Sequence, residues 1–563
     1  MDSRTAAHTL SRIAAYLELK GENTFKTRAY VGAAKALLAL GADDLGPMNR
    51  SGELAAVRGL GPATLAVVRD LIETGASRYL EQLRESTPEG LLAMLDVPGL
   101  TPARIHQIYE TLNISTIEEL EAAAQDGRLA TLPKLGPKTA AKILEGISTA
   151  RAHGSLRLYP HALVEAQPLL ASVRSHPLVE RAELAGALRR KLEVVGSIDI
   201  VAACTTNPEA VAQSFARLPG VRSADGSGAT VSVEFVDGAR MRLRCVEPDR
   251  FGIAFFEETG GDAHVADVKR FIETPAVIAS AREEDEVYAA ARLPVIAPEL
   301  REGMGEVDAA RRGVLPELLV ASDIRGVLHC HSTYSDGKAT IAEMARAAQA
   351  RGWSYIGITD HSQAAFYAGG LKRDAVLAQH DEIDALNATL TGFRVLKGIE
   401  ADILADGQVD YGDDLLDRFD FVVGSIHSRF SMDGAAMTAR VLRALDDPRL
   451  TILAHPTGRL LLARAPYALG VDAVLEKAAA VGAAVELNAD PHRLDLDWRH
   501  LHKAKQLGVT IEIGPDAHST NGLDNMDVGI GIARKGWLER SDVLNARSAD
   551  DVVAFARARR LGN

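Results

Sequence analysis

The sequence predicts a multidomain protein with a helical N-terminal region, an α+β middle region and a C-terminal (β/α)7 barrel. Three observations support this division. Residues 1–160 show apolar residues at helical spacing and little β-branched alternation. Residues 160–295 contain strand-like runs between helical stretches. From residue 325 onward, seven apolar strand-like runs alternate with helical ones, a pattern typical of a parallel sheet buried on both faces.

The bulk composition is that of an ordinary globular protein. The chain has 563 residues, of which 47% are hydrophobic and 25% are charged, so several domains are expected. No apolar run approaches the roughly 20 residues that a membrane helix needs, and the first residues lack the apolar stretch of a signal peptide. Three scattered cysteines suit a reducing compartment. We therefore expect a cytoplasmic protein without membrane spans.

The net charge of −13 is unevenly distributed. Residues 1–160 carry 18 basic and 18 acidic residues, so the remaining 45 basic and 58 acidic residues supply the whole deficit. Global charge therefore gives no support for nucleic-acid binding, and any such binding must be local.

The helical region repeats one pattern three times: an apolar residue, a tight turn and an amphipathic helix. The copies span residues 57–72, 97–112 and 133–148. This is a repeat of the helix-hairpin-helix kind, in which free N–H groups at a helix start can hold a DNA phosphate without reading bases. The residues predicted to contact DNA are Gly59, Gly61, Gly99, Gly136 and Lys138. The alternative is three ordinary helical corners.

The barrel region carries polar residues where its apolar runs end. The candidate metal ligands are His329, His331, Asp336, His361, Glu400, His427, His455, Asp516 and His518. Active sites of barrels collect at the carboxyl ends of the strands. Any one histidine could be a packed or surface residue, but six of the chain's 16 histidines follow consecutive strands. We therefore predict a site for two or three divalent metal ions.

The mixture of ligands indicates which metals and which chemistry to expect. Imidazole and carboxylate together suit zinc, manganese or iron better than calcium or magnesium alone. Clustered cations polarise a phosphoryl oxygen and activate water, as phosphoester hydrolysis requires. Arg459, Arg464 and Arg493 lie near ligand loops and are candidates for holding substrate phosphate, although each could equally form a surface ion pair. Cys330, between two ligands, is expected in the core.

These motifs carry a family resemblance. The succession of HxH, SDG, TDHS, GIE, SIHS, HPTGR and DAH resembles the PHP (polymerase and histidinol phosphatase) domain, a distorted (β/α)7 barrel with a three-metal site. From residue 21 to the end, the chain resembles a bacterial family X DNA polymerase with a C-terminal PHP domain. The resemblance implies a manganese-preferring 3′→5′ exonuclease, with gapped or 3′-recessed duplex DNA as partner.

The resemblance also implies a division into six parts. We expect a lyase-like helical domain over 1–85, a fingers-like helical domain over 86–155, a palm-like domain over 156–246, a thumb-like domain over 247–300, a linker over 301–324 and the PHP domain over 325–563.

The polymerase half departs from the family pattern. Two of the three metal-holding carboxylates of the palm are missing, because Ser197 and Arg242 occupy their positions and only Asp199 remains. Glu257 and Glu258 replace two aromatic residues of the nucleotide pocket, and Val67 replaces the lyase lysine. A lone carboxylate cannot hold the two cations of nucleotide addition.

We therefore predict a DNA repair protein whose PHP barrel is the working catalyst and whose polymerase-like half binds DNA. One alternative is an active gap-filling polymerase that uses Asp199, magnesium or manganese, and a substitute carboxylate such as Glu234. Another is a DNA-binding scaffold whose metal site only stabilises the barrel, and a small-molecule phosphatase is a further one.

Overall fold

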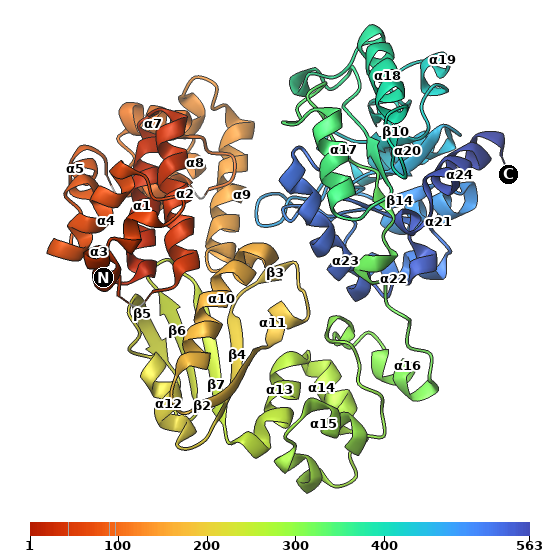
Figure 1. The fold of residues 1–563 in the computed structure, drawn as a ribbon. Coiled ribbons are helices and arrows are strands. Elements are labelled where there is room, and N and C mark those ends of the chain that lie inside the picture. The colour runs from red at the N-terminus through yellow and green to blue at the C-terminus, as the bar shows by residue number, and fades with distance from the viewer. Residues whose placement is uncertain (43, 89, 96, 563) are drawn as a thin grey trace. The chain divides into compact units, whose positions relative to one another are not determined.

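The computed structural model describes residues 1–42, 44–88, 90–95 and 97–562, and it divides into two compact units (Figure 1). The first unit contains Met1–Arg189 and Val194–Val295. The second contains the chain from Ile296 onward together with the short segment Arg190–Glu193. The predicted six-part division is finer than these two units and stays a prediction.

The N-terminal part of the first unit is helical, as predicted. Its helices are α1 (Ser3–Leu19), α2 (Thr24–Leu40), α3 (Gly46–Ser51), α4 (Pro62–Thr74), α5 (Arg78–Ser86), α6 (Gly90–Leu95), α7 (Pro102–Leu112), α8 (Ile117–Gln125) and α9 (Pro137–His153). They pack around two separate apolar clusters, one including Leu10 and Leu37 and the other including Ile105 and Ile143. Each cluster holds at least one of the three hairpins in place.

A five-stranded sheet forms the middle of the first unit. Its order is β2 (Val179–Leu184), β4 (Ile198–Cys204), β7 (Arg240–Val246), β6 (Thr230–Phe235) and β5 (Val221–Asp225), and β1 (Arg157–Leu158) pairs separately with β3 (Val194–Val195). Within the five-stranded sheet only β4 and β7 pair in parallel. Helices α10 (Tyr159–Ser175) and α12 (Pro208–Phe215) pack on this sheet, and so do α11 (Gly186–Arg189) and α13 (Phe251–Thr259). Helices α14 (Asp262–Lys269) and α15 (Glu284–Ala290) complete the unit.

The second unit contains the seven predicted strand runs, all paired in parallel. One sheet joins β8 (Gly326–Val327), β9 (Tyr355–Ile358) and β10 (Arg394–Lys397), and the other joins β11 (Glu400–Asp402), β12 (Val422–Ser425), β13 (Leu450–Leu453), β14 (Ala484–Asn488) and β15 (Ile511–Gly514). Parallel bridges from His361 to Glu400 and from Cys330 to Ala517 link the two sheets at both edges. Because β10 and β11 belong to one run, the seven runs form a closed ring.

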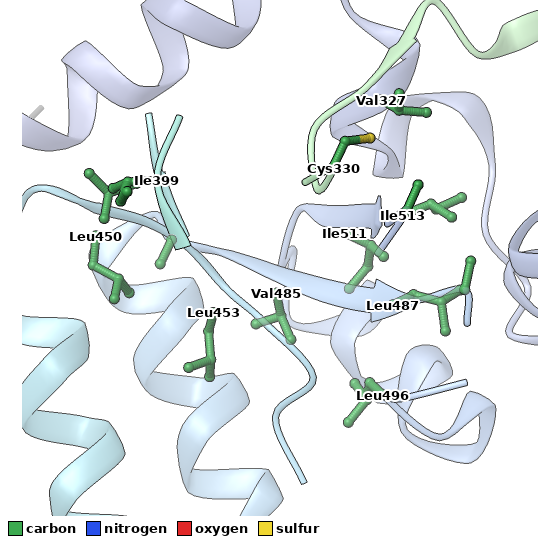
Figure 2. Packing of buried hydrophobic residues seen from close by; sticks show 14 of the residues in the cluster. Val327, Cys330, Ile399, Leu450, Leu453, Val485, Leu487, Leu496, Ile511 and Ile513 are labelled. Carbon is green, nitrogen blue, oxygen red and sulfur yellow. The ribbon is translucent and has the colours of Figure 1, made fainter. Parts of the chain in front are cut away.

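Helices surround this ring and supply its core. They are α17 (Ile341–Ala350), α18 (Arg373–Asn387), α19 (Asp413–Leu416), α20 (Gly434–Asp446), α21 (Val471–Val481), α22 (Trp498–Gln506), α23 (Asn525–Lys535) and α24 (Ala549–Leu561). Helix α16 (Glu306–Arg312) precedes the first barrel strand in the chain. Figure 2 shows residues of the main buried cluster, among them Val485, Leu487, Ile511 and Ile513 from β14 and β15. Cys330 is fully buried in the same cluster, as expected.

The segment expected as a linker, residues 301–324, is in fact part of the second unit. Leu319 is fully buried in the barrel core, and its N–H donates to the carbonyl of Leu538 at 3.0 Å. The part of this segment around Leu319 therefore packs against the barrel. Among the described residues, no helix combines the length and apolar character that crossing a membrane requires.

Candidate metal centre

The structure brings all nine predicted ligand residues together at the carboxyl end of the barrel. They follow β8 (His329, His331, Asp336), β9 (His361), β12 (His427), β13 (His455) and β15 (Asp516, His518), and Glu400 opens β11. Strands of a parallel ring all end on one side, so residues far apart in sequence converge there.

Ligand atoms of eight of these residues form three overlapping groups, within each of which they lie no more than 4.8 Å apart. The groups are His331, Asp336, His361 and His518; His329, His331 and Asp516; and His361, Glu400 and His427. His331 and His361 each belong to two groups, so the three are contiguous. The ninth residue, His455, joins through its Nε2, which lies 3.1 Å from Oε1 of Glu400.

Several buried ring nitrogens in this centre have no hydrogen-bond partner among the described residues. They are Nε2 of His329, Nδ1 and Nε2 of His331, Nδ1 of His361 and Nδ1 of His455. A buried polar atom without a partner is costly unless something else satisfies it. Imidazole nitrogens beside carboxylates are the donors that zinc, manganese and iron accept, so the residues present fit a divalent cation.

The electrostatics of the centre favour charged carboxylates. Burial by itself would raise the pKa of Glu400, but the neighbouring His361, His427 and His329 lower it well below its usual value. Although burial lowers the pKa of an imidazole, the charge of Glu400 raises the pKa of His361 to about 10 and that of His427 to about 9. The carboxylates therefore hold protons on these rings, and a bound cation would take the place of those protons.

Two carboxylates that the sequence analysis missed orient the ligands. Nδ1 of His329 lies 2.5 Å from Oε1 of Glu486, whose other oxygen accepts the N–H of His455 at 2.6 Å. Nδ1 of His427 lies 2.8 Å from Oδ1 of Asp402. Such contacts fix the tautomer and direction of an imidazole so that its other nitrogen faces the metal. Both carboxylates lie on barrel strands, β14 and β11. A charged residue within an otherwise apolar strand run is the feature of the sequence that could have identified them.

The three predicted phosphate-binding arginines have different surroundings. Nε of Arg493 lies 3.6 Å from Oδ2 of Asp516, so this side chain reaches the centre. Arg464 lies over the ring of Phe430 and donates to the carbonyl of Gly458. Arg459 is buried and donates to Asp497 and to the carbonyls of Arg493 and Leu494. Of the three arginines, Arg493 is thus the one that reaches the centre, whereas Arg459 holds the neighbouring loops together.

In the first unit, Asp199 stands beside an arginine rather than another carboxylate. Asp199 on β4 and Arg242 on β7 are direct partners in the parallel register. Gly186 approaches so closely that an added Cβ would lie 2.0 Å from Oδ2 of Asp199, and this glycine has a positive φ of 58°. The turn before α11 therefore needs glycine, and the strand pairing puts a cation next to the remaining carboxylate.

The charged residues around Asp199 are joined in ion pairs. Arg242 donates to Glu258 at 2.7 Å, and Arg244 contacts both Glu258 and Glu257. Lys269 on α14 also donates to Glu257, at 2.7 Å. Glu257 and Glu258 thus neutralise the arginines of β7.

The alternative polymerase carboxylate, Glu234, lies elsewhere on the sheet. It occupies β6, and β7 separates β6 from β4, so two strand spacings of about 4.8 Å each lie between Glu234 and the strand of Asp199. Glu234 also pairs with Arg222 and Arg240, at 3.3 Å each. Glu234 is thus separated from Asp199 by one strand and is engaged with two arginines.

The three hairpins place helix N-termini at the surface of the first unit. Gly59 and Gly99 have positive φ angles of 105° and 89°, and Lys134 takes the same place in the third hairpin with a φ of 66°. Gly61 and Gly136 are the N-caps of α4 and α9 with φ angles of −91° and −60°. These two glycines therefore have backbone angles that other residues can also adopt. An added Cβ at either would meet no atom within 4 Å, so their small size matters only for an approaching ligand.

Lys138, in the first turn of α9, is one of the exposed cations of the third hairpin. Its ammonium group can add charge to the N–H groups of that helix start.

Comparison with known proteins agrees with the fold. The PHP domain family model matches residues 328–483, a SAM-like helix-hairpin-helix tandem matches 91–149, and a helix-hairpin-helix domain matches 1–77. The chain is therefore a PHP-domain protein with helix-hairpin-helix domains before the barrel. DNA polymerase/3′-5′ exonuclease PolX of Bacillus subtilis strain 168 is 37% identical over 574 residues, covering 99% of this chain and 100% of the relative. The chain belongs to the PolX family.

Other relatives match the barrel region only. A probable phosphatase of Caldanaerobacter subterraneus subsp. tengcongensis is 28% identical over 256 residues, covering 42% of this chain and 93% of the relative. A probable phosphatase of Syntrophotalea carbinolica is 34% identical over 166 residues, covering 29% of this chain and 64% of the relative. The barrel thus has relatives that lack the polymerase-like half.

Proposed function

We propose that this chain is a DNA repair enzyme of the cytoplasm whose barrel removes nucleotides from DNA 3′ ends. The nine ligand residues would hold two or three divalent ions, manganese or zinc, with iron as the alternative. The helical and palm-like domains would bind gapped or 3′-recessed duplex DNA without regard to sequence. This proposal extends the activity named for the Bacillus subtilis relative to the present chain.

The observation that carries the proposal is the contiguity of the three ligand groups with their unpartnered nitrogens. His331 and His361 are shared between groups, so ions held there would act on one phosphodiester. Such ions supply polarisation of the phosphoryl oxygen, a nucleophilic water and stabilisation of the leaving oxygen. A barrel that used these histidines for packing alone would not need charged carboxylates beside them.

The chain's own residues would position the substrate. Arg493 is 22% exposed at its side chain and stands 3.6 Å from Asp516, so its guanidinium can hold a non-bridging phosphate oxygen beside the centre. Glu486 and Asp402 keep His329 and His427 in the required orientation.

We further propose that the palm-like domain binds DNA but adds nucleotides negligibly or very weakly. Two observations support this proposal. The two cations that accompany a triphosphate need carboxylates around them, but the residue in register with Asp199 is the cation Arg242. The acids Glu257 and Glu258 would also repel the triphosphate, and Glu258 is engaged with Arg242. The distance of Glu234 from Asp199 argues against the active-polymerase alternative.

Metal analysis and a nuclease assay on a 3′-recessed duplex test the main proposal. Purified protein should contain two or three transition metal ions per chain and shorten 3′ ends with manganese. His331→Ala and Asp516→Ala should each lower the rate by at least about a thousandfold, since each removes a group that holds metal. Their DNA affinity should stay near that of the wild type.

Full nuclease activity in both variants would contradict the assignment. A wild-type protein that binds DNA and metal but leaves every 3′ end intact would favour the scaffold alternative. Efficient hydrolysis of small phosphomonoesters without cleavage of DNA would favour the small-molecule phosphatase.

A further inference from the structure

Two exposed aromatic rings stand beside the metal centre and have no role in it so far. Phe366 is 86% exposed and Tyr367 is 62% exposed, on a short 3-10 turn between β9 and α18. Among the described residues of the second unit, no other phenylalanine, tyrosine or tryptophan is exposed. Neighbouring rings at this exposure indicate a surface that contacts a ligand.

The turn lies directly at the centre. The ring centroid of Tyr367 is 6.4 Å from that of His361 and 6.2 Å from that of His427. The ring of Phe366 follows at 6.1 Å from Tyr367, at an angle of 78°. A molecule whose phosphodiester reached the ligand histidines would therefore have its neighbouring groups beside these rings.

The turn is held by its base, so the rings have a defined position. Ala365, Ala368 and Leu371 are buried. The N–H of Ala364 donates to Asp410 at 2.8 Å, and the N–H of Leu371 donates to the carbonyl of His361 at 2.8 Å. The second bond ties the end of the turn to a candidate ligand residue, and a rigid aromatic surface binds at a low cost in entropy.

The chemistry of the turn selects a flat, uncharged group. Residues 362–371 contain no charged side chain, whereas the adjacent centre is rich in carboxylates and imidazoles. The ligand that combines a phosphodiester with a flat ring at short range is a nucleotide in a chain. Aromatic side chains stack on bases without selecting sequence, because every base has a π face.

We propose that Phe366 and Tyr367 form a stacking platform for the base of the 3′-terminal nucleotide and so position its phosphodiester at the metal centre. They are positioning residues. This inference rests on the proposed exonuclease function and adds the group by which the barrel recognises its substrate. It implies that the barrel distinguishes a 3′ end that carries a base from one that lacks it.

The first arm of the test compares two DNA substrates with the full-length protein. One ends in a normal nucleotide and the other in an abasic tetrahydrofuran residue. Phe366→Ala should lower kcat/KM for the base-bearing end on the order of tenfold, as loss of one stacked ring does, and leave the abasic end unchanged. Tyr367→Ala should act alike, whereas Tyr367→Phe, which keeps the ring, should behave as the wild type. Leu561→Ala, at an exposed apolar residue of α24, is the matched control.

The second arm does not depend on catalysis. An oligonucleotide with 2-aminopurine at its 3′ end should lose fluorescence on binding the Asp516→Ala protein, because stacking quenches this base. Adding Phe366→Ala should remove that quenching.

Equal losses on both substrates, or equal quenching with and without Phe366, would overturn the inference. A change of oligomeric state in Phe366→Ala without a change in base discrimination would overturn it in favour of a protein contact. If the wild type cleaved neither end, the proposed function would fail, and the quenching would still decide whether the platform binds the terminal base.

Discussion

The barrel and the palm-like sheet treat charged residues in opposite ways. At the barrel end, carboxylates and imidazoles face one another, and several buried ring nitrogens make no hydrogen bond to a described residue. On the sheet, Arg242 and Arg244 are matched by Glu258 and Glu257. The first arrangement keeps donor atoms available to a cation, whereas the second satisfies its charges internally.

The two arrangements differ in the atoms that they leave available to a cation. The sheet keeps its strand order and the close contact of Gly186 with Asp199, both of which depend on packing. Arg242 is in register with Asp199, and a cation beside this carboxylate opposes the binding of a metal ion there. Backbone architecture and chemical function therefore depend on separate residues of the same sheet.

The largest expected effect concerns nucleotide addition by the palm-like domain, and strong nucleotide addition would contradict the comparison. We expect primer extension to be negligible or very weak, orders of magnitude below a competent polymerase, since metal-holding carboxylates are missing. Residual extension should require manganese and disappear in Asp199→Ala. Primer extension with magnesium and with manganese measures this. Robust extension with magnesium would show that another carboxylate serves the site.

The barrel side of the comparison is sharpened by Glu486→Gln. The change weakens the orientation of His329 without removing a ligand, so metal affinity should fall about 10- to 100-fold. Titration of metal into the metal-free protein measures it. Glu382→Gln is the matched control, because this carboxylate accepts a hydrogen bond from the hydroxyl of Tyr334 and not from a candidate ligand. Unchanged affinity in Glu486→Gln would mean that His329 is held by its other neighbours.

DNA binding by the first unit should depend on the hairpins rather than on net charge. Gly61→Val and Gly136→Val place side chains over helix starts without an internal clash, so DNA affinity should fall several-fold while the fold persists. Few released counterions also predict a weak dependence of the Kd on salt. Gly32→Val on α2, where an added Cβ also meets no atom within 4 Å, is the control. Equal affinities would make the hairpins merely structural.

The smallest effect concerns a carboxyl behind the centre. Burial, then the charge of Glu486, raises the pKa of Glu512 to about 8 from an ordinary 4.5. The folded state therefore binds this proton more tightly than the unfolded state, and its contribution to stability is lost as pH rises from about 4.5 through 8. The Tm difference between Glu512→Gln and the wild type should thus be more favourable to the variant at pH 9 than at pH 5, by about 2–4 °C or more. Calorimetry at both pH values measures the difference, and an equal Tm change at both would contradict the shifted pKa.

Much of the barrel could be predicted because its signals are local. A strand run followed by a histidine predicts both the element and the side of the ring on which the residue lies, as for His361 and His455. Glu486 and Asp402 were missed because their role depends on which neighbouring strand faces them. Sequence proximity also misled for Arg459, whose donors are used within the barrel. The role of Leu319 likewise depends on a distant partner, Leu538.

The bridge between Cys330 and Ala517 also bears on how the chain is made. The hairpins come first along the chain, whereas the centre gathers residues from His329 through His518 and is incomplete until the last strand run closes the ring. A polypeptide that ends before Asp516 would therefore fold its hairpins but lack two of the nine candidate ligand residues, Asp516 and His518.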